Sequence, residues 1–134
     1  MRFEEVEHTA DRALRIHGRD LSELFANAAD GMNSLMRPAG TGDADRIAKR
    51  IELEALDPES LLVAWLSELA FWAETECLVF SRFDFLELSA TRLRADIHGS
   101  RADGLEKHIK AVTFHDLAIR RGPEGLVVTV VFDV

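Results

Sequence analysis

The chain of 134 residues lacks features on which several protein classes depend. Its only cysteine, Cys77, excludes an internal disulfide and fits a reducing cytoplasm. No apolar run approaches the roughly 18 residues that span a bilayer. Two adjacent glutamates near the start stand where a signal peptide would need an apolar stretch. We therefore expect a cytoplasmic protein with no membrane partner.

Recognisable catalytic motifs are also missing from the sequence. It contains no HExxH, P-loop or GxSxG motif and no dense cluster of carboxylates. A single site with two or three oxygen ligands suits structural or assisting chemistry better than hydrolysis. The sequence thus argues against an enzyme, and an independent metal-dependent hydrolase remains the less favoured alternative.

Basic residues are too few and too scattered for a strong grip on nucleic acid. The chain has 24 acidic and 16 basic residues and a formal net charge of −8. Proteins that bind the phosphate backbone cluster their lysines and arginines, whereas the tight basic groups here are only Lys49-Arg50 and Arg120-Arg121. A basic protein partner or a cation is the easier inference.

Two segments have the apolar spacing of helices. Asp20 is a good N-cap for a helix over residues 21–36, whose apolar residues form one stripe. Asp57, Pro58 and Glu59 are typical of a helix start, and the residues that follow up to 76 are apolar on nearly every face. We expect this second helix to be the central helix of the core.

The remaining segments read mainly as strands. We expect strands over residues 2–7, 12–18, 45–56, 80–88, 93–97, 109–119 and 126–132, with loop at 98–104 and turns near 90–92 and 122–125. The alternation in 45–56 slips near Ala48, which suggests a bulge or a late start. No linker divides the chain, so we expect one domain over residues 1–134. The order β-β-α-β-α-β-β-β-β predicts an α+β fold with two helices packed on a mainly antiparallel sheet.

The last predicted strand runs into Asp133 and Val134, which places carboxylates at the tip of a strand. Adjacent carboxyl groups repel unless a cation or hydrogen-bond donors offset them. With Asp11 at the start of the second strand, three oxygen-bearing groups could converge as ligands of a hard cation. From the residues alone, a solvated Asp133 and a simple turn at Thr9 and Asp11 remain open as alternatives.

Four blocks of the sequence resemble the archease family in the same order along the chain. They are EHTAD (residues 7–11), LSELFANAADGM at the start of the first helix, KAVTFH (residues 110–115) and VVFDV at the end. The resemblance covers the whole chain. It departs from the family pattern at Arg12, where an aliphatic residue is usual, and at the closing valine.

The resemblance implies a specific function. Archeases are accessory proteins of the RtcB-type RNA ligase, which joins tRNA halves after intron removal. They promote guanylylation of the ligase and its multiple turnover, so RNA is reached only through the ligase. The implied fold is an α+β domain of the strand-helix-strand-strand type. The implied cofactor is a divalent cation, calcium with Mg or Mn as alternatives, held by Asp11, Asp133 and a main-chain or terminal oxygen of Val134.

Supporting residues follow from the same resemblance. Glu7, His8 and Thr9 would fix the turn that presents Asp11, with His8 donating a ring N–H to a carboxylate. Lys110 would reach the ligase or its nucleotide cleft, whereas a lysine at such a position also commonly extends into solvent. The alternative function is a small metal-binding scaffold or a chaperone-like module.

Overall fold

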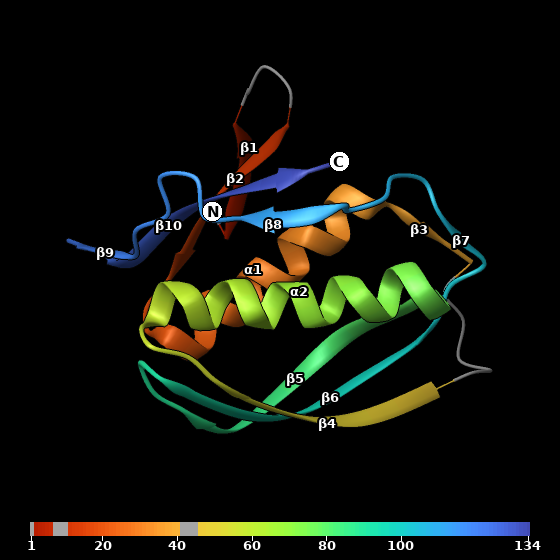
Figure 1. Cartoon of the computed structure of the whole chain (residues 1–134), viewed down its shortest axis with the longest axis horizontal. Coiled ribbons are helices and arrows are strands. Elements are labelled where there is room, and N and C mark those ends of the chain that lie inside the picture. Colours follow the sequence, from red (N-terminus) through yellow and green to blue (C-terminus); the bar gives the residue numbers. More distant parts are fainter. Residues whose placement is uncertain (1, 7–10, 41–45) are drawn as a thin grey trace.

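The computed structural model describes residues 2–6, 11–40 and 46–134. Two helices, α1 (Leu21–Met36) and α2 (Pro58–Glu76), form a layer between two antiparallel sheets (Figure 1). The hydrophobic core occupies both faces of this helical layer, because side chains from the helices and from both sheets belong to one buried cluster. In the described ranges, no helix is long and apolar enough to cross a bilayer.

Among the described residues, the strands pair in three separate sheets. The five-stranded sheet has the order β1-β2-β10-β8, and β9 also pairs with β10. Its strands are β1 (Phe3–Val6), β2 (Arg12–Gly18), β8 (Ala111–Thr113), β9 (Arg120–Gly122) and β10 (Gly125–Asp133). The three-stranded sheet has the order β4-β6-β5, with β4 (Arg46–Glu54), β5 (Leu78–Leu88) and β6 (Arg92–Arg101). The short strands β3 (Pro38–Ala39) and β7 (Gly104–Leu105) pair with each other.

Both helices begin where the sequence predicts. The carboxylate of Asp20 accepts a hydrogen bond from the Glu23 N–H at 2.9 Å, and that of Asp57 accepts one from the Ser60 N–H at 2.7 Å. Each bond satisfies a backbone donor that the helix itself leaves unpaired. The N-caps at both starts are therefore confirmed, as is Pro58 in the first turn of α2.

Trp65 of α2 connects both helices and the smaller sheet. Its side chain is fully buried, and its indole N–H donates to the main-chain oxygen of Phe25 in α1 at 3.0 Å. Its ring packs against Phe83 and Phe85 of β5, with centroids 5.5 and 5.4 Å away. One side chain thus contributes apolar contact and satisfies its own polar group at the centre of the core.

The predicted α+β class, with two helices packed on mainly antiparallel strands, is confirmed. The strands form separate sheets because α2 is apolar on nearly all sides and needs apolar partners on two opposite sides. It contacts β4, β5 and β6 on one side and β8 on the other.

Residues 98–104, predicted as loop, are mostly strand. β6 continues to Arg101, and β7 begins at Gly104. Gly99 lies so close to β5 that a Cβ atom there would come within 2.1 Å of the Val79 main-chain oxygen. This position requires glycine, which interrupts the alternation of apolar and polar residues in β6. The end of the strand therefore has no recognisable strand pattern in the sequence.

The prediction of a strand over residues 109–119 is correct only for Ala111–Thr113, which form β8. Asp116 has a left-handed φ of 48°, and the Leu117 N–H donates to the Phe114 oxygen at 3.1 Å, which closes a turn. The chain then pairs with the other end of β10 through β9. The apolar residues of this segment contact the core through the turn as well as through the strand.

The bulge suggested near Ala48 is also absent from the pairing of β4 with β6, which is regular throughout. The apolar pattern slips because Lys49 occupies an inward-facing position. Its ammonium lies 3.9 Å from the centre of the Trp72 ring, an arrangement in which an aromatic face stabilises the cation.

Replacing Trp65 with Phe tests its hydrogen bond. The variant keeps an aromatic ring but removes the indole N–H that donates to Phe25 and shrinks a fully buried side chain, so we expect the free energy of unfolding to fall by about 1–3 kcal/mol. Trp72→Phe in the same helix is the control, since the Trp72 N–H reaches only the partly exposed Glu68. Denaturant unfolding should rank Trp65→Phe as the clearly weaker variant; equal losses would contradict the role given to Trp65.

The N-cap at Asp57 predicts a pH-dependent contribution to stability. The Ser60 backbone N–H lowers the pKa of Asp57 from its usual value. A lowered folded-state pKa means that the stabilisation is fully present above the unfolded pKa of about 4 and is lost as the pH falls below it. We therefore expect Asp57→Ala to lower the melting temperature by a few degrees at pH 7 and by much less at pH 3. A difference independent of pH would exclude the carboxylate as its source.

Candidate functional site

The central strand β10 brings the two predicted aspartates to one end of the five-stranded sheet. Its pairing with β2 places Phe132 opposite Arg12. Extended by one residue, the same register sets Asp133 beside Asp11. Directly opposed residues on antiparallel strands have their Cβ atoms about 4.5–5.5 Å apart, and like charges there repel. The register thus brings the backbone positions of Asp11 and Asp133 close together, although the two residues lie 122 positions apart in the sequence.

The side chain of Asp133 points away from the helices. Phe132 is fully buried against them, and successive residues of a strand alternate between faces. Asp133 is accordingly exposed, whereas Val134 packs against the edge of the core. The partial burial of Val134 against the core and the full burial of Phe132 hold the chain on both sides of Asp133.

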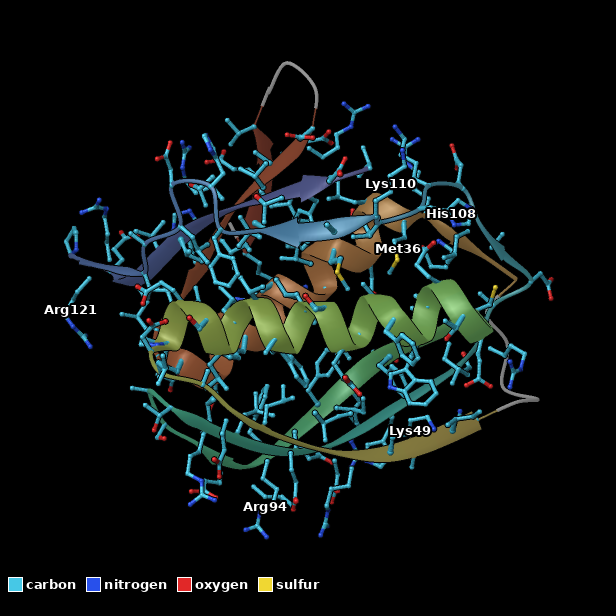
Figure 2. The ribbon with its side chains drawn as sticks, viewed as in Figure 1. Met36, Lys49, Arg94, His108, Lys110 and Arg121 are labelled. Carbon is cyan, nitrogen blue, oxygen red and sulfur yellow. The ribbon has the colours of Figure 1, made fainter. Side chains whose placement is uncertain are left out.

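Lys110 lies next to Asp133 on the neighbouring strand. Its backbone N–H donates to the main-chain oxygen of Asp133 at 2.7 Å, just before β8 begins. Its side chain is exposed, and it borders a groove of about 260 Å³ between β8 and α2 that Phe71 and Glu74 also line. Figure 2 shows Lys110 and His108 at the end of the molecule where α1 finishes with Met36. Backbone pairing therefore fixes Lys110 next to Asp133, with the lysine side chain directed to the exposed groove on the α2 side of the sheet.

Glu74 anchors the segment that carries Lys110, although it belongs to no motif of the sequence. One carboxylate oxygen lies 2.9 Å from Nδ1 of His108, and the other accepts the Ile109 N–H at 3.2 Å. An acidic residue near the C-terminal end of a helix is unfavourable for the helix dipole. That unfavourable position was the available sign that Glu74 has a specific partner.

Arg12, the departure from the family pattern, faces the other side of the sheet from Asp133. It stands opposite Phe132 and so shares the helix-facing side. Its Nε lies 3.3 Å from the carboxylate of Glu5. Its charge is thus directed toward Glu5 rather than toward the exposed face on which Asp133 lies.

Glu7, His8 and Thr9 lie outside the described residues. His115 is exposed, with its Nε2 3.3 Å from Asp116. Within the described ranges, no group of three or more His, Cys, Asp or Glu side chains gathers as a metal site. Two aspartates with main-chain oxygens are a hard-oxygen donor set, which fits Ca²⁺ or Mg²⁺ in type and requires water to complete the coordination.

The fold and site together define a small α+β protein with two helices between antiparallel sheets and paired carboxylates at one sheet end. The model of the Archease protein family matches residues 3–134. Protein archease of Methanosarcina acetivorans is 33% identical over 99% of this chain and 96% of its own. Protein archease of Methanothermobacter thermautotrophicus is 36% identical over 87% of each chain. The chain belongs to the archease family.

Two solved structures have the same fold. A solution structure of a Methanobacterium thermoautotrophicum protein is 30% identical and matches with a TM-score of 0.71 over 99% of both chains. A crystal structure from Thermotoga maritima, described as an archease and possible chaperone, is 22% identical and matches with a TM-score of 0.70 over 98% of this chain and 96% of its own. The second likeness concerns the fold alone.

Calcium titration tests whether the paired aspartates hold a cation. With a chelator present, Asp133→Asn should melt at or above the temperature of the wild type, because it removes repulsion between like charges. With excess Ca²⁺, the wild type should gain several degrees and Asp133→Asn should gain almost nothing. Asp116→Asn, an exposed position away from the pair, is the control and should respond as the wild type does. A calcium response that survives in Asp133→Asn would place the ion elsewhere.

Proposed function

We propose that this protein is an accessory activator of an RtcB-type RNA ligase, promoting its guanylylation and multiple turnover in tRNA splicing. Membership of the archease family supports the proposal. The observation that supports it most is the backbone register, which brings the positions of Asp11 and Lys110 next to Asp133 at one end of the five-stranded sheet. These groups are what an assisting site for phosphate chemistry needs, and they stand beside exposed surface.

Asp11, Asp133 and a main-chain or terminal oxygen of Val134 would hold the divalent cation, expected to be calcium with Mg or Mn as alternatives. When bound, the ion supplies positive charge that can offset phosphate oxygens. The chain's own groups act around it. Lys110 uses its N–H to fix the Asp133 backbone, which leaves its ammonium available to an anionic group of the partner.

The partner in this proposal is the ligase, with RNA reached only through it. A formal charge of −8 favours a basic protein surface over a phosphate backbone. We expect no ligase activity from this chain alone, and we expect both proteins to meet in the cytoplasm. The activator can work either by placing charges near the ligase nucleotide site or by favouring the active state of the ligase.

A chaperone-like function is the second candidate, and one observation favours it. Phe71 on α2 and Phe114 after β8 are 54% and 60% exposed. Exposed aromatic side chains are common at protein-binding surfaces. An activator should depend on the aspartates and Lys110, whereas a chaperone-like module should depend on the two phenylalanines and be indifferent to the aspartates.

Ligation by the cognate RtcB-type ligase distinguishes these functions. Guanylylation and multiple-turnover ligation should rise with the wild type. Asp11→Asn, Asp133→Asn and Lys110→Ala should each lose at least about tenfold of that stimulation while remaining folded. Single-turnover ligation by a ligase that is already guanylylated should change little.

Arg94→Ala is the matched control. Arg94 is an exposed cation on β6, on the far side of the helical layer from Lys110 (Figure 2). The control should stimulate as the wild type does. Stimulation that persists without either aspartate would contradict the carboxylate site, and stimulation lost only in Phe71→Ser or Phe114→Ser would favour the chaperone-like function.

A further inference from the structure

The three-stranded sheet has an open edge at β4. In the described part of the chain, β4 pairs only with β6, through nine consecutive residues in regular register. The opposite edge, β5, has register shifts between Phe80 and Arg82 and between Phe85 and Glu87. Irregularities of that kind protect a sheet edge from pairing with another strand. β4 has neither a bulge nor a proline, so its outward backbone groups keep regular strand geometry, and only its charged side chains guard the edge.

The backbone groups of alternate β4 residues point outward from the sheet. The Ala55 N–H donates to the Thr91 oxygen at 2.9 Å, so odd-numbered residues of this strand direct their N–H and C=O groups toward β6. The bond from the Ser89 N–H to the Arg92 oxygen shows that even-numbered residues of β6 pair with β5. The odd-numbered residues of β6 are therefore the ones that pair with β4. The residues whose backbone groups face the open edge are therefore Arg46, Ala48, Arg50, Glu52 and Glu54.

The charges along this edge are complementary to those of a second copy. The strand carries arginines at its start and centre, at positions 46 and 50, and glutamates in its second half, at 52 and 54. Antiparallel pairing of two copies centred on Arg50 places Arg46 opposite Glu54 and pairs all nine residues. Glu54 also meets Arg92 of its own chain at 2.8 Å, so the new contact would extend an existing ion pair.

The like charges at the centre of this pairing are already compensated. Arg50 holds the carboxylate of Asp96 through two hydrogen bonds of 2.8 and 3.0 Å. Lys49, on the inner face, directs its ammonium toward Trp72 rather than toward the edge. Both cations therefore have a partner within their own chain, and salt screens the repulsion that remains between the two copies.

The inner face of the strand also favours a second copy. Ile47 and Leu53 are only half-buried in the single chain. In the register centred on Arg50 they lie opposite each other across the new pair. Each would lose exposed apolar surface as the two sheets join beneath their helices, which adds hydrophobic stabilisation to the backbone bonds.

We propose that two copies of this chain associate through antiparallel pairing of their β4 edges, joining the two three-stranded sheets into one. The pairing forms about ten main-chain hydrogen bonds. It leaves the candidate site open on both copies, since β8 and β10 lie on the other side of the helices from β4 (Figure 1). The proposal is independent of the function of that site.

Sedimentation equilibrium at micromolar to near-millimolar concentrations tests the proposal, in physiological salt. The wild type should show a reversible monomer–dimer equilibrium. Ala48→Pro removes an N–H that faces the open edge and is not used in pairing with β6, so the monomer should fold normally while the dimer dissociation constant rises at least about tenfold. Ala48→Thr keeps the N–H and is the control, with a dissociation constant no weaker than that of the wild type. Circular dichroism and melting temperature verify the fold of each variant.

A disulfide trap tests the register. In a Cys77→Ser background, Arg50→Cys places one thiol at the centre of the pair, where Cα atoms about 5.5 Å apart allow a disulfide between copies. Mild oxidation should give a covalent dimer for Arg50→Cys and none for Arg94→Cys on β6. A wild type that stays monomeric throughout, or a dimer unaffected by Ala48→Pro, would overturn the proposal.

Discussion

The pairing of β2 with β10 is the contact on which the rest of the structure depends. It joins β2, the second strand, to β10, the last strand, with residues 126–132 opposite residues 18–12. Such a ladder permits one register, because a slip by one residue would turn every buried side chain to the wrong face. The same alignment that sets Leu14 beside Val130 in the core sets Asp11 beside Asp133 at the sheet end. Core and candidate site are consequences of one register.

The second constraint is the helix that separates the sheets. α2 is buried on most of its surface, and its residues contact the smaller sheet below and β8 above. Trp65 satisfies its N–H within this layer, so the centre of the core carries no unpaired indole donor. Because the helices cover the inner faces, each sheet turns its other face outward. The candidate carboxylates belong to one sheet and the open β4 edge to the other, which allows assembly and partner binding without competition for surface.

Local chemistry made the helices and their starts predictable, because each cap is completed within three residues, as Asp57 and Ser60 show. The segment before and after β8 was less predictable. Ile109 is held by Glu74 of α2, and the chain turns at Asp116 soon after the three residues that pair with β10. Lys49 disturbed the apolar pattern of β4 without disturbing the strand, since Trp72 accommodates its charge. In each case the deciding partner comes from another element, which a local pattern does not contain.

The sequence by itself determined the α+β class, both helices with their N-caps, and the candidate residues Asp11, Asp133 and Lys110. These follow from short-range spacing, turn chemistry and blocks of residues that resemble one family. Only the tertiary structure decided that the strands divide into separate sheets, that Arg12 turns toward Glu5, and that Glu74 positions the segment leading to Lys110. The physical reason is that register and layer order depend on which faces can be buried together, and that burial involves contacts between residues far apart in the chain.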